Sequence, residues 1–480
     1  MLWLALLLPD LPLQVFTRGM VDIPLVITVG HPRPQIIAAS PQARAHGVEV
    51  GQSIAAALAA APALQLQPRT PALESETLIE VASWAGSFTP RVSLAPPDTV
   101  LLEIEASLKL FGGPDAIVSS MHEGIARLGL HASIAIAPTP LAARWFARVH
   151  PQAWQPSVAD WRNRLDVLPL ELLADGTGIG ESTLELLAGV GMRSLGEIRQ
   201  LPRAGLARRQ ANSVIDALAR ARGETPDPQS WFEPPPKYAY RIALPAPVIH
   251  ADPLLFAARR LFAGLAAWLA ARHAAVDHCC LELIHARTPP TTVDIVSGAP
   301  CREESRFVLL ARERLNRIEL QSPVEELRLT AEASSPFTPQ SGDLFGSPGQ
   351  VRDSALLLLD RLRARLGADA VHLLDTRNDH RPEVATTEMP ADLAASDRAG
   401  RRPPSPDQAP RPLWLLPSPR ALDPHDIALL DGPERLEGGW WDQADMSRDY
   451  YLARGPGQAL WWVFHDLGDP GSWYVHGYFG

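Results

Sequence analysis

The sequence is poor in cysteine and in long apolar runs. Its three cysteines, Cys279, Cys280 and Cys301, are too few for a disulfide framework and have no metal-ligand spacing, which fits a reducing cytosol. No segment strings together the ~18 apolar residues that cross a bilayer. The apolar opening, residues 2–8, has no basic flank and stops at Pro9, unlike a signal peptide. We therefore expect a cytoplasmic protein without a membrane segment, whose first apolar run is a buried β-strand.

Positive charge is also scarce. The 44 basic residues include only two lysines, Lys109 and Lys237, and face 54 acidic residues, so the net charge is −10. This net charge excludes a protein whose whole surface is basic, although it is compatible with a local basic face. Hydrophobic residues make up 46% of the 480 positions and there are 47 prolines. That composition indicates several packed cores, many turns and at least one extended linker.

Hydrophobic patterning divides the chain into segments of different character. Strand-like and helical stretches alternate over residues 1–150, which indicates an α/β or α+β sheet domain. Short helices separated by Gly and Pro follow over 151–225, and a Pro-rich linker over 226–237. A second α+β domain spans 238–375. We expect residues 376–411 to be disordered and 412–480 to form an aromatic-rich module.

The second α+β domain has the clearest periodicities. Leu254, Leu261, Leu265, Trp268 and Leu269 have the spacing of a core-facing helix. A polar Ser/Pro/Gly-rich insertion, residues 333–349, precedes the last helix. The expected order is strand 239–249, helix 253–273, strand 277–286, strand 291–297, helix 303–319, strand 324–332, helix 350–366 and strand 370–374.

The helical segment contains a glycine turn that could face DNA. Gly178 and Gly180 precede a helix, and in a helix-hairpin-helix such glycines let backbone N–H groups face a phosphate without reading base sequence. Residues 201–223 add five arginines, among them Arg203, Arg208 and Arg209, against a single acidic residue. A plain turn followed by a solvated basic helix would leave the same pattern, so both interpretations stay open.

The insertion carries the stretch Gln340-Ser-Gly-Asp343-Leu344-Phe345. Its apolar pair lies between Pro339 and Gly346, in a polar region with no core to join, which is typical of a linear peptide that docks on another protein. The stretch is similar to the peptide by which bacterial polymerases attach to the sliding clamp. Gln340, Asp343, Leu344 and Phe345 are therefore the expected clamp-binding residues, although short motifs of this kind also recur by chance.

Carboxylates are sparse where phosphoryl transfer would need them. Two-metal sites need about three converging carboxylates, and residues 2–8 contain none. Asp98, Glu103 and Glu105 cluster near a predicted second strand, with Glu103 and Glu105 on one face. We interpret these two glutamates as solvent-exposed strand charges. The sequence also contains no Ser-His-Asp, P-loop or H-E-x-x-H pattern.

These segments together resemble the Y-family, translesion DNA polymerases over essentially the whole chain. The resemblance is closest to a bacterial branch of DNA-damage proteins that are regarded as polymerase-like but catalytically inactive. The tail, Gly432 to Asp442 followed by Arg448-Asp-Tyr-Tyr451, is similar to a C-terminal module that active members do not have. The other segments that carry the resemblance are residues 1–16, 36–48, 98–103, 111–113, 135–144 and 201–209.

The family's functional residues carry over only in part. Its first metal-binding Asp falls at Leu7, its Asp-Glu pair at Asp98-Thr99, and its nucleotide-contacting Tyr at Pro41. Arg44 and Arg144 remain as contacts for a triphosphate or the DNA backbone. One carboxylate of three cannot organise two Mg²⁺ ions. The resemblance therefore implies no metal, no cofactor and no catalysis.

What the resemblance implies for the whole chain is an α+β multidomain right hand: a palm with fingers, a helical thumb, a little finger and an extra C-terminal module. The implied role is that of a non-catalytic scaffold in DNA repair, within the SOS response and mutagenic translesion synthesis. Its implied partners are DNA, the sliding clamp, an error-prone C-family DNA polymerase and a RecA-like accessory protein.

Two alternatives stay open. One is an active Y-family polymerase that uses Asp10, Asp98 and Glu103 in a shifted arrangement. The other is a helix-hairpin-helix nuclease subunit or glycosylase, for which only Asp175 and Glu181 lie near Gly180.

Overall fold

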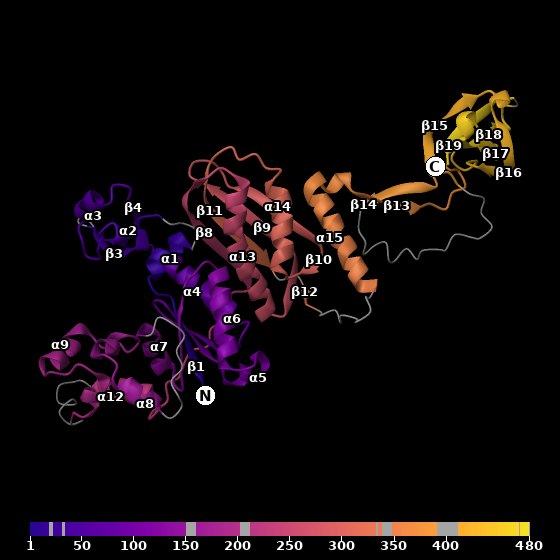
Figure 1. Cartoon of the computed structure of the whole chain (residues 1–480). Coiled ribbons are helices and arrows are strands. Elements are labelled where there is room, and N and C mark those ends of the chain that lie inside the picture. The colour runs from indigo at the N-terminus through magenta and orange to yellow at the C-terminus, as the bar shows by residue number, and fades with distance from the viewer. Residues whose placement is uncertain are drawn as a thin grey trace. The chain divides into compact units, whose positions relative to one another are not determined.

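The computed structural model describes residues 1–18, 23–30, 34–149, 160–201, 212–332, 335–337, 348–390, 411–469 and 471–479. Within it the chain divides into two compact units, Met1–Arg365 and Leu366–Gly480. Figure 1 shows the elements of each unit.

The first unit opens with a four-stranded antiparallel sheet, here called the N-terminal sheet. Its order is β5 (Val92–Ala95), β6 (Thr99–Glu103), β1 (Trp3–Leu7) and β7 (Ser133–Ala137), so β1 lies between two partners. Leu4 and Leu6 pack against helices α4 (Pro71–Ala85) and α6 (Pro114–Arg127), and the alternate residues of β1 pack against α7 (Pro140–Val149). Because both faces of β1 are covered, its sequence is apolar throughout. The predicted buried first strand is confirmed.

The chain forms a smaller sheet in the stretch between α1 (Leu11–Thr17) and α4. It consists of β3 (Gln35–Ala39), β2 (Leu25–Val29) and β4 (Gln65–Pro68), with helices α2 (Pro41–Ala45) and α3 (Ile54–Ala60) beside it. Ser40 caps α2, since its Oγ accepts a hydrogen bond from the backbone N of Ala43 at 3.2 Å. After β6, η1 (Glu105–Ser107) and α5 (Leu108–Phe111) lead into α6.

Residues 160–201 and 212–221 form the helical segment. It contains α8 (Trp161–Asp166), η2 (Leu170–Ala174), α9 (Glu181–Gly189), α10 (Leu195–Arg199) and α12 (Asn212–Ala221). The expectation of short helices without strands holds for these described residues. Their apolar side chains, Leu173 and Ile198 among them, share one core with α7 and the adjacent face of β1. The helical segment is therefore anchored on the N-terminal sheet through α7.

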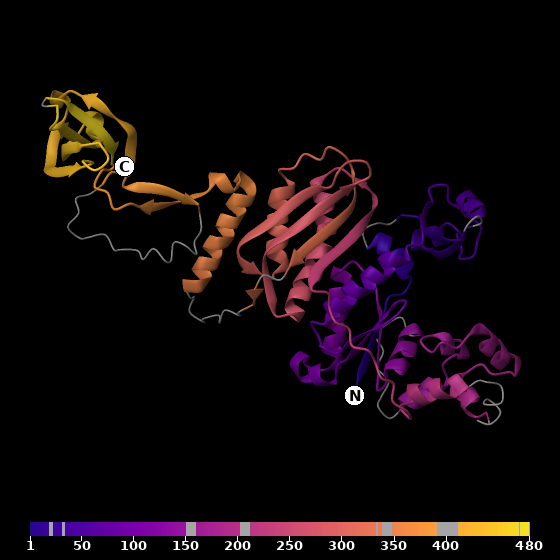
Figure 2. The same cartoon turned by 180° about the vertical axis from the view of Figure 1, so that it is seen from behind.

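The central sheet has the antiparallel order β10 (Thr291–Cys301), β9 (Ala274–His285), β11 (Val324–Glu332) and β8 (Lys237–Val248), and short β12 (Ser335–Pro336) pairs with β9. Helices α13 (Ala251–Ala271) and α14 (Glu304–Leu315) cover one face, and the opposite face is seen in Figure 2. α15 (Pro348–Leu366) follows. The predicted elements of the second α+β domain up to this helix are confirmed, with small shifts at their ends.

Helix α13 corrects the expectation that no segment is long and apolar enough to cross a bilayer. Among the described residues it is the one helix that is long and apolar enough to cross a membrane by length and composition, yet 67% of the apolar window is buried inside the protein. The predicted face, Leu254 to Leu269, is buried in the core of the central sheet. α13 is therefore a core helix whose apolar character comes from packing on the sheet on one side and on α4 and α14 on the others.

The N-terminal and central sheets also share a polar interface. Arg18 and Glu80 form a fully buried ion pair (Nη2 to Oε2, 2.7 Å), and the hydroxyl groups of Ser83 and Tyr240 lie 3.1 Å apart. Arg18 and Glu80 both precede the central sheet in the chain, so of these two contacts it is the one between Ser83 and Tyr240 that joins α4 to β8.

The second unit begins with a hairpin of β13 (His372–Thr376) and β14 (Thr386–Pro390), preceded by η3 (Ala368–Ala370). Its main body is the C-terminal sheet, in the order β15 (Trp414–Leu422), β19 (Trp473–Tyr478), β18 (Leu460–Asp466), β17 (Met446–Arg454) and β16 (Ala428–Gly438). Short turns η4 (Pro424–Asp426) and η5 (Pro456–Gln458) join its strands.

The hairpin differs from the sequence-based expectation in two ways. The strand expected at 370–374 pairs with β14 rather than with the central sheet, and residues 376–390, expected to be disordered, are ordered. The physical reason lies in Arg381, between the two strands, which bonds to Asp379 and Asp442 with both ends of its guanidinium. These long-range contacts are invisible to local composition. Residues 391–410 lie outside the described residues.

Candidate functional site

The candidate site is the corner of the N-terminal sheet where the resemblance places metal ligands. Leu7 of β1 lies directly opposite Thr99 of β6, and the backbone N of Leu8 donates to the carbonyl of Asp98 at 2.8 Å. The three carried-over positions therefore meet in space. Only Asp98 supplies a carboxylate there, since Leu7 is buried among apolar side chains and Thr99 is fully buried.

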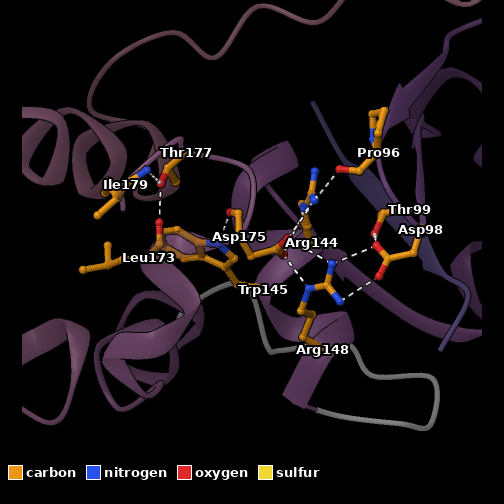
Figure 3. A network of polar contacts seen from close by, with 10 residues as sticks. All are labelled: Pro96, Asp98, Thr99, Arg144, Trp145, Arg148, Leu173, Asp175, Thr177 and Ile179. Atoms are coloured by element: carbon orange, nitrogen blue, oxygen red, sulfur yellow. Dashed lines mark hydrogen bonds and ion pairs between the residues drawn. The ribbon is translucent and has the colours of Figure 1, made fainter. Parts of the chain in front are cut away.

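Asp98 is paired with an arginine. Arg148 of α7 donates from Nη1 to Oδ2 at 3.0 Å and from Nη2 to Oδ1 at 2.8 Å, and the Thr99 hydroxyl donates to Oδ1 at 3.0 Å. Figure 3 shows this two-pronged contact. Such a fork is a strong, charge-assisted contact that holds the Asp98 carboxylate against the guanidinium.

A second carboxylate, Asp175, joins the corner from the helical segment. Arg144 donates to it from Nε at 2.9 Å and from Nη2 at 2.7 Å, and Arg148 also reaches it from Nη2 at 2.9 Å. The indole Nε1 of Trp145 donates to the backbone carbonyl of Asp175 at 3.0 Å. Arg144 also bonds to the carbonyl of Pro96 at 2.9 Å. As Figure 3 shows, these contacts connect α7, the β5–β6 turn and the segment after η2.

The local backbone explains how Asp175 reaches this position. It ends the short η2 turn, and the next residue, Gly176, has a φ of +76°. A Cβ at Gly176 would lie 3.2 Å from the Arg144 guanidinium. Glycine therefore permits both the left-handed turn and the close approach of the cation. Further along, the Thr177 hydroxyl donates to the Leu173 carbonyl and accepts from the Ile179 backbone N.

The electrostatics of the corner favour the charged forms. Burial alone would raise the pKa of Asp175, but hydrogen bonds from Arg148 and Arg144 outweigh it and hold the pKa below its ordinary value. Burial would likewise lower the pKa of Arg148, and the bonds to Asp175 and Asp98 raise it instead. Two arginines and two aspartates thus form a compact, internally neutralised network.

This donor set does not fit a pair of divalent cations. Mg²⁺ is held by carboxylates and substrate phosphates, whereas this corner presents a leucine, a threonine and a carboxylate already bonded to a guanidinium. Among the described residues no group of three or more His, Cys, Asp or Glu side chains could hold a metal ion. We derive no catalytic step through a metal here.

The alternative carboxylate set is not assembled either. Glu103 lies opposite Trp3 at the far end of β6, about 16 Å along the extended chain from Asp98, which directly precedes this strand. The expectation that Glu103 is a solvent-exposed charge is wrong. It is buried, bonds to Arg91 at 3.1 Å and accepts the backbone N of Glu105, which lies in η1 rather than in the strand. Asp10 faces Arg44 instead, at 3.3 Å.

The residues expected to contact phosphate differ in their exposure to solvent. Arg44 is half-exposed, whereas the side chain of Arg144 is only 7% exposed and is bonded to Asp175, so Arg144 faces a protein carboxylate and not an open surface. Gly178 has a φ of +76° and Gly180 is the N-cap of α9, with nothing within 4 Å of a Cβ at either position. The turn is therefore open to a ligand.

The remaining predicted site residues lie outside the described residues. These are the basic positions Arg203, Arg208 and Arg209 and the clamp-binding positions Gln340, Asp343, Leu344 and Phe345. Conversely, sequence reasoning missed the roles of Arg148 and Asp175. The spacing of Arg144 and Arg148, four residues apart on one helix, does place both on one face. That spacing indicates convergence on an acidic group but cannot identify which one.

Comparison with known proteins shows what the chain is similar to. Residues 13–148 match the impB/mucB/samB family. Over 469 residues, which cover 90% of this chain and the whole of the other, the sequence is 26% identical to Protein ImuB of Caulobacter vibrioides (strain NA1000 / CB15N). The chain is ImuB-like. The resemblance predicted from the sequence is confirmed, as is the α+β multidomain fold class.

Other relatives match less of the ImuB-like chain. DNA polymerase IV of Yersinia pseudotuberculosis serotype O:1b (strain IP 31758) is 29% identical over 196 residues, 38% of this chain and 53% of that protein. Two solved structures are similar as well. "Dbh Ternary Complex (substrates partially disordered)" has 14% identity and a TM-score of 0.40, covering 69% of this chain and 99% of that chain. "Crystal Structure of DinB from Sulfolobus solfataricus" has 13% identity and a TM-score of 0.39, covering 70% and 100%.

Proposed function

We propose that this ImuB-like chain is a non-catalytic scaffold of mutagenic translesion DNA synthesis. In this proposal it holds DNA and the sliding clamp and recruits an error-prone C-family DNA polymerase together with a RecA-like accessory protein. The observation that carries the proposal is the state of the candidate site. Leu7 and Thr99 replace two ligands, and Arg148 occupies the remaining carboxylate, Asp98.

In this proposal the corner has a structural role, because it connects the N-terminal sheet to the helical segment. A cation that would neutralise carboxylates in a metal site is supplied by the protein itself, because Arg148 bonds to Asp98 of the sheet and to Asp175 of the helical segment. These two ion pairs join the helical segment to the N-terminal sheet. A polymerase-like fold that keeps the contacts between its segments but lacks the metal ligands is suited to positioning DNA and partners for another enzyme.

Primer extension by the purified full chain tests the absence of catalysis. With a primed template, all four deoxynucleoside triphosphates and Mg²⁺ or Mn²⁺, we expect no incorporation. An active polymerase run in the same buffer is the control. Incorporation that disappears in Asp98→Ala would overturn the scaffold proposal and favour the alternative, an active Y-family polymerase with a displaced carboxylate set.

Clamp capture tests the peptide at Gln340 to Phe345. In the double variant Leu344→Ala/Phe345→Ala we expect capture by immobilised clamp to be lost, because the apolar pair would fill a pocket on the clamp. Leu358→Ala is a matched control, since it removes an exposed leucine from the neighbouring helix α15. Equal capture of the double variant and the control would refute the clamp assignment.

Salt dependence tests the DNA contact. If Arg203, Arg208 and Arg209 each neutralise a phosphate, the triple alanine variant should reduce the slope of log K against log salt by about 3 on duplex DNA. The control triple Arg259→Ala/Arg312→Ala/Arg328→Ala removes the same charge at exposed positions elsewhere in the first unit. A slope that changes equally in both triples would indicate a general charge effect and no specific contact.

A further inference from the structure

The loop between β16 and β17 presents two tryptophans to solvent. Trp440 is 73% exposed and Trp441 is 54% exposed, whereas Tyr450, Trp462 and Phe464 form the buried aromatic core of the same sheet. The aromatic residues of the C-terminal unit thus serve two purposes. One set builds the core, and this pair remains outside it.

The loop is held in one conformation. Gly439 has a φ of +92°, and a Cβ there would lie 2.0 Å from the carbonyl oxygen of Ala444. Arg381 bonds to Asp442 at 2.9 and 2.6 Å and lies over the ring of Trp441, 5.4 Å from its centroid. The exposure of Trp440 is therefore built into the fold. A fixed, exposed tryptophan is characteristic of interface hot spots.

A cavity of about 400 Å³ opens beside Trp440 and carries negative charge. Among the described residues, none of its three carboxylates forms an ion pair, although Glu437 lies within electrostatic range of Arg435, whose ion pair is with Asp449. Glu437 accepts the hydroxyl of Ser447, and Asp466 accepts the backbone N of Gly468. The lining consists of Glu437, Gly438, Trp440, Asp445, Met446, Ser447, Asp466 and Gly468.

We infer that this cavity binds an arginine side chain presented by a partner protein. A guanidinium can stack on the indole of Trp440 while its fork of donors reaches the carboxylates around the cavity. Charge also excludes DNA as the occupant, since residues 411–480 carry ten acidic side chains and five arginines. The inference rests on the proposed partner-binding role of the C-terminal unit and names the chemistry that this role uses.

Fluorescence anisotropy on the full chain tests the inference. The probe is a fluorescein-labelled peptide of Gly, Ser and Arg, compared with the same peptide carrying citrulline, the neutral isostere, in place of arginine. We expect the arginine peptide to bind about tenfold more tightly, and Trp440→Ala to remove about that factor. Trp414→Ala is the matched control, because Trp414 is 71% exposed on β15 and is not among the cavity residues. It should leave binding unchanged.

A second pair of variants separates local contact from net charge. Asp445→Asn should weaken the arginine peptide, whereas Asp426→Asn, which removes the same charge from η4, should not. Equal binding of the two peptides, or equal effects within either pair of variants, would overturn the inference. Tighter binding in Arg401→Gln/Arg402→Gln would also overturn it, because the chain's own arginines would then be the occupant. The clamp variant Leu344→Ala/Phe345→Ala should bind the peptide normally. The arginine test therefore gives its result independently of whether the clamp assignment is correct.

Discussion

At the scale of single residues, an arginine satisfies the carboxylate that the sequence resemblance marks as a metal-ligand position. Arg148 is bonded at once to Asp98 and Asp175, and Arg144 holds Asp175 from the other side. Asp98 thus has a cationic partner within the protein itself.

Asp175→Asn tests this network. The variant leaves two arginines facing one carboxylate, so we expect local stability at α7 and β6 to fall by about 2–3 kcal/mol, less than for a fully buried pair because Arg148 is partly exposed. Native-state hydrogen exchange of those amides measures it. Asp160→Asn, at an exposed pair with Arg164, should cost about 0.5 kcal/mol or less.

The same network predicts a pH dependence. Because the folded pKa of Asp175 lies below its ordinary value of 3.8, its contribution is complete above about pH 4 and is lost as the pH falls through the folded pKa. The stability gap between the wild type and Asp175→Asn should therefore narrow toward pH 3. A gap that stays constant from pH 6 to pH 3 would show that Asp175 does not titrate as the ion pairs require.

His476 is a second titratable residue with a consequence. It is fully buried, its Nδ1 lies 2.8 Å from the Tyr450 hydroxyl, and its ring stacks on Trp462. Burial lowers its pKa below 6.5; Glu383 opposes that shift and Arg448 adds to it. The folded state therefore holds the neutral imidazole, whereas the unfolded chain takes up a proton near pH 6.5.

We expect the C-terminal sheet to lose stability as the pH falls below about 6.5, by at most about 1.4 kcal/mol per pH unit. Hydrogen exchange of β17 and β19 amides between pH 7.5 and 5.5 measures this slope. His476→Phe keeps an aromatic ring at the position but removes the titrating group, so its slope should be flat. An unchanged slope in this variant would assign the pH effect to another group.

At the scale of elements, the packing of α7 on β1 decides the character of the site. Leu7 belongs to the apolar core that joins the N-terminal sheet to the helical segment. The strand face that would present a ligand is thus covered, and a carboxylate introduced there would be buried without a partner.

Leu7→Asp should consequently fail to restore activity. We expect no primer extension and a loss of about 3 kcal/mol or more in the stability of the N-terminal sheet, since Arg148 stays bonded to Asp98 and the new charge is buried. Leu110→Asp, at a position in α5 that is 82% exposed, is the control and should be nearly neutral. A stable Leu7→Asp protein that incorporates nucleotides would show that the corner is open to metal and substrate.

Strongly periodic elements were predictable from the sequence, and their pairing was not. The apolar spacing of α13 and the continuous run of β1 are local signals that identify a core helix and a buried strand. The strand that pairs with β13 was not predictable in this way. β13 pairs with β14, and Arg381 between the two strands bonds to Asp442, 61 residues further along the chain, a contact that no local pattern encodes.

At the scale of the whole molecule, the two units have separate cores. The C-terminal sheet has its own apolar clusters, around Phe464 and around Val463, whereas α4 and α13 join the N-terminal and central sheets within the first unit. The buried pair of Arg18 and Glu80 lies at that junction. The first unit should therefore unfold as one body and the second by itself.

Differential scanning calorimetry should show two transitions. Glu80→Gln, which leaves Arg18 buried without its charged partner, should lower the transition of the first unit by several degrees and leave the other in place. Asp449→Asn, which breaks the pair with Arg435 in the C-terminal sheet, should affect the second transition alone. Separate melting of the N-terminal and central sheets would contradict the shared interface.

The sequence by itself determined the α+β character, the elements of the second α+β domain up to α15 and the absence of carboxylates from residues 2–8, because each depends on residue identity or on local spacing. The tertiary structure alone decided which groups pair with Asp98. Asp98, Arg148 and Asp175 come from three separate segments and meet only when α7 packs on the sheet. The burial of Glu103 and the exposure of Trp440 follow the same rule. Charge pairing and solvent exposure are properties of the packed chain, and periodicity does not contain them.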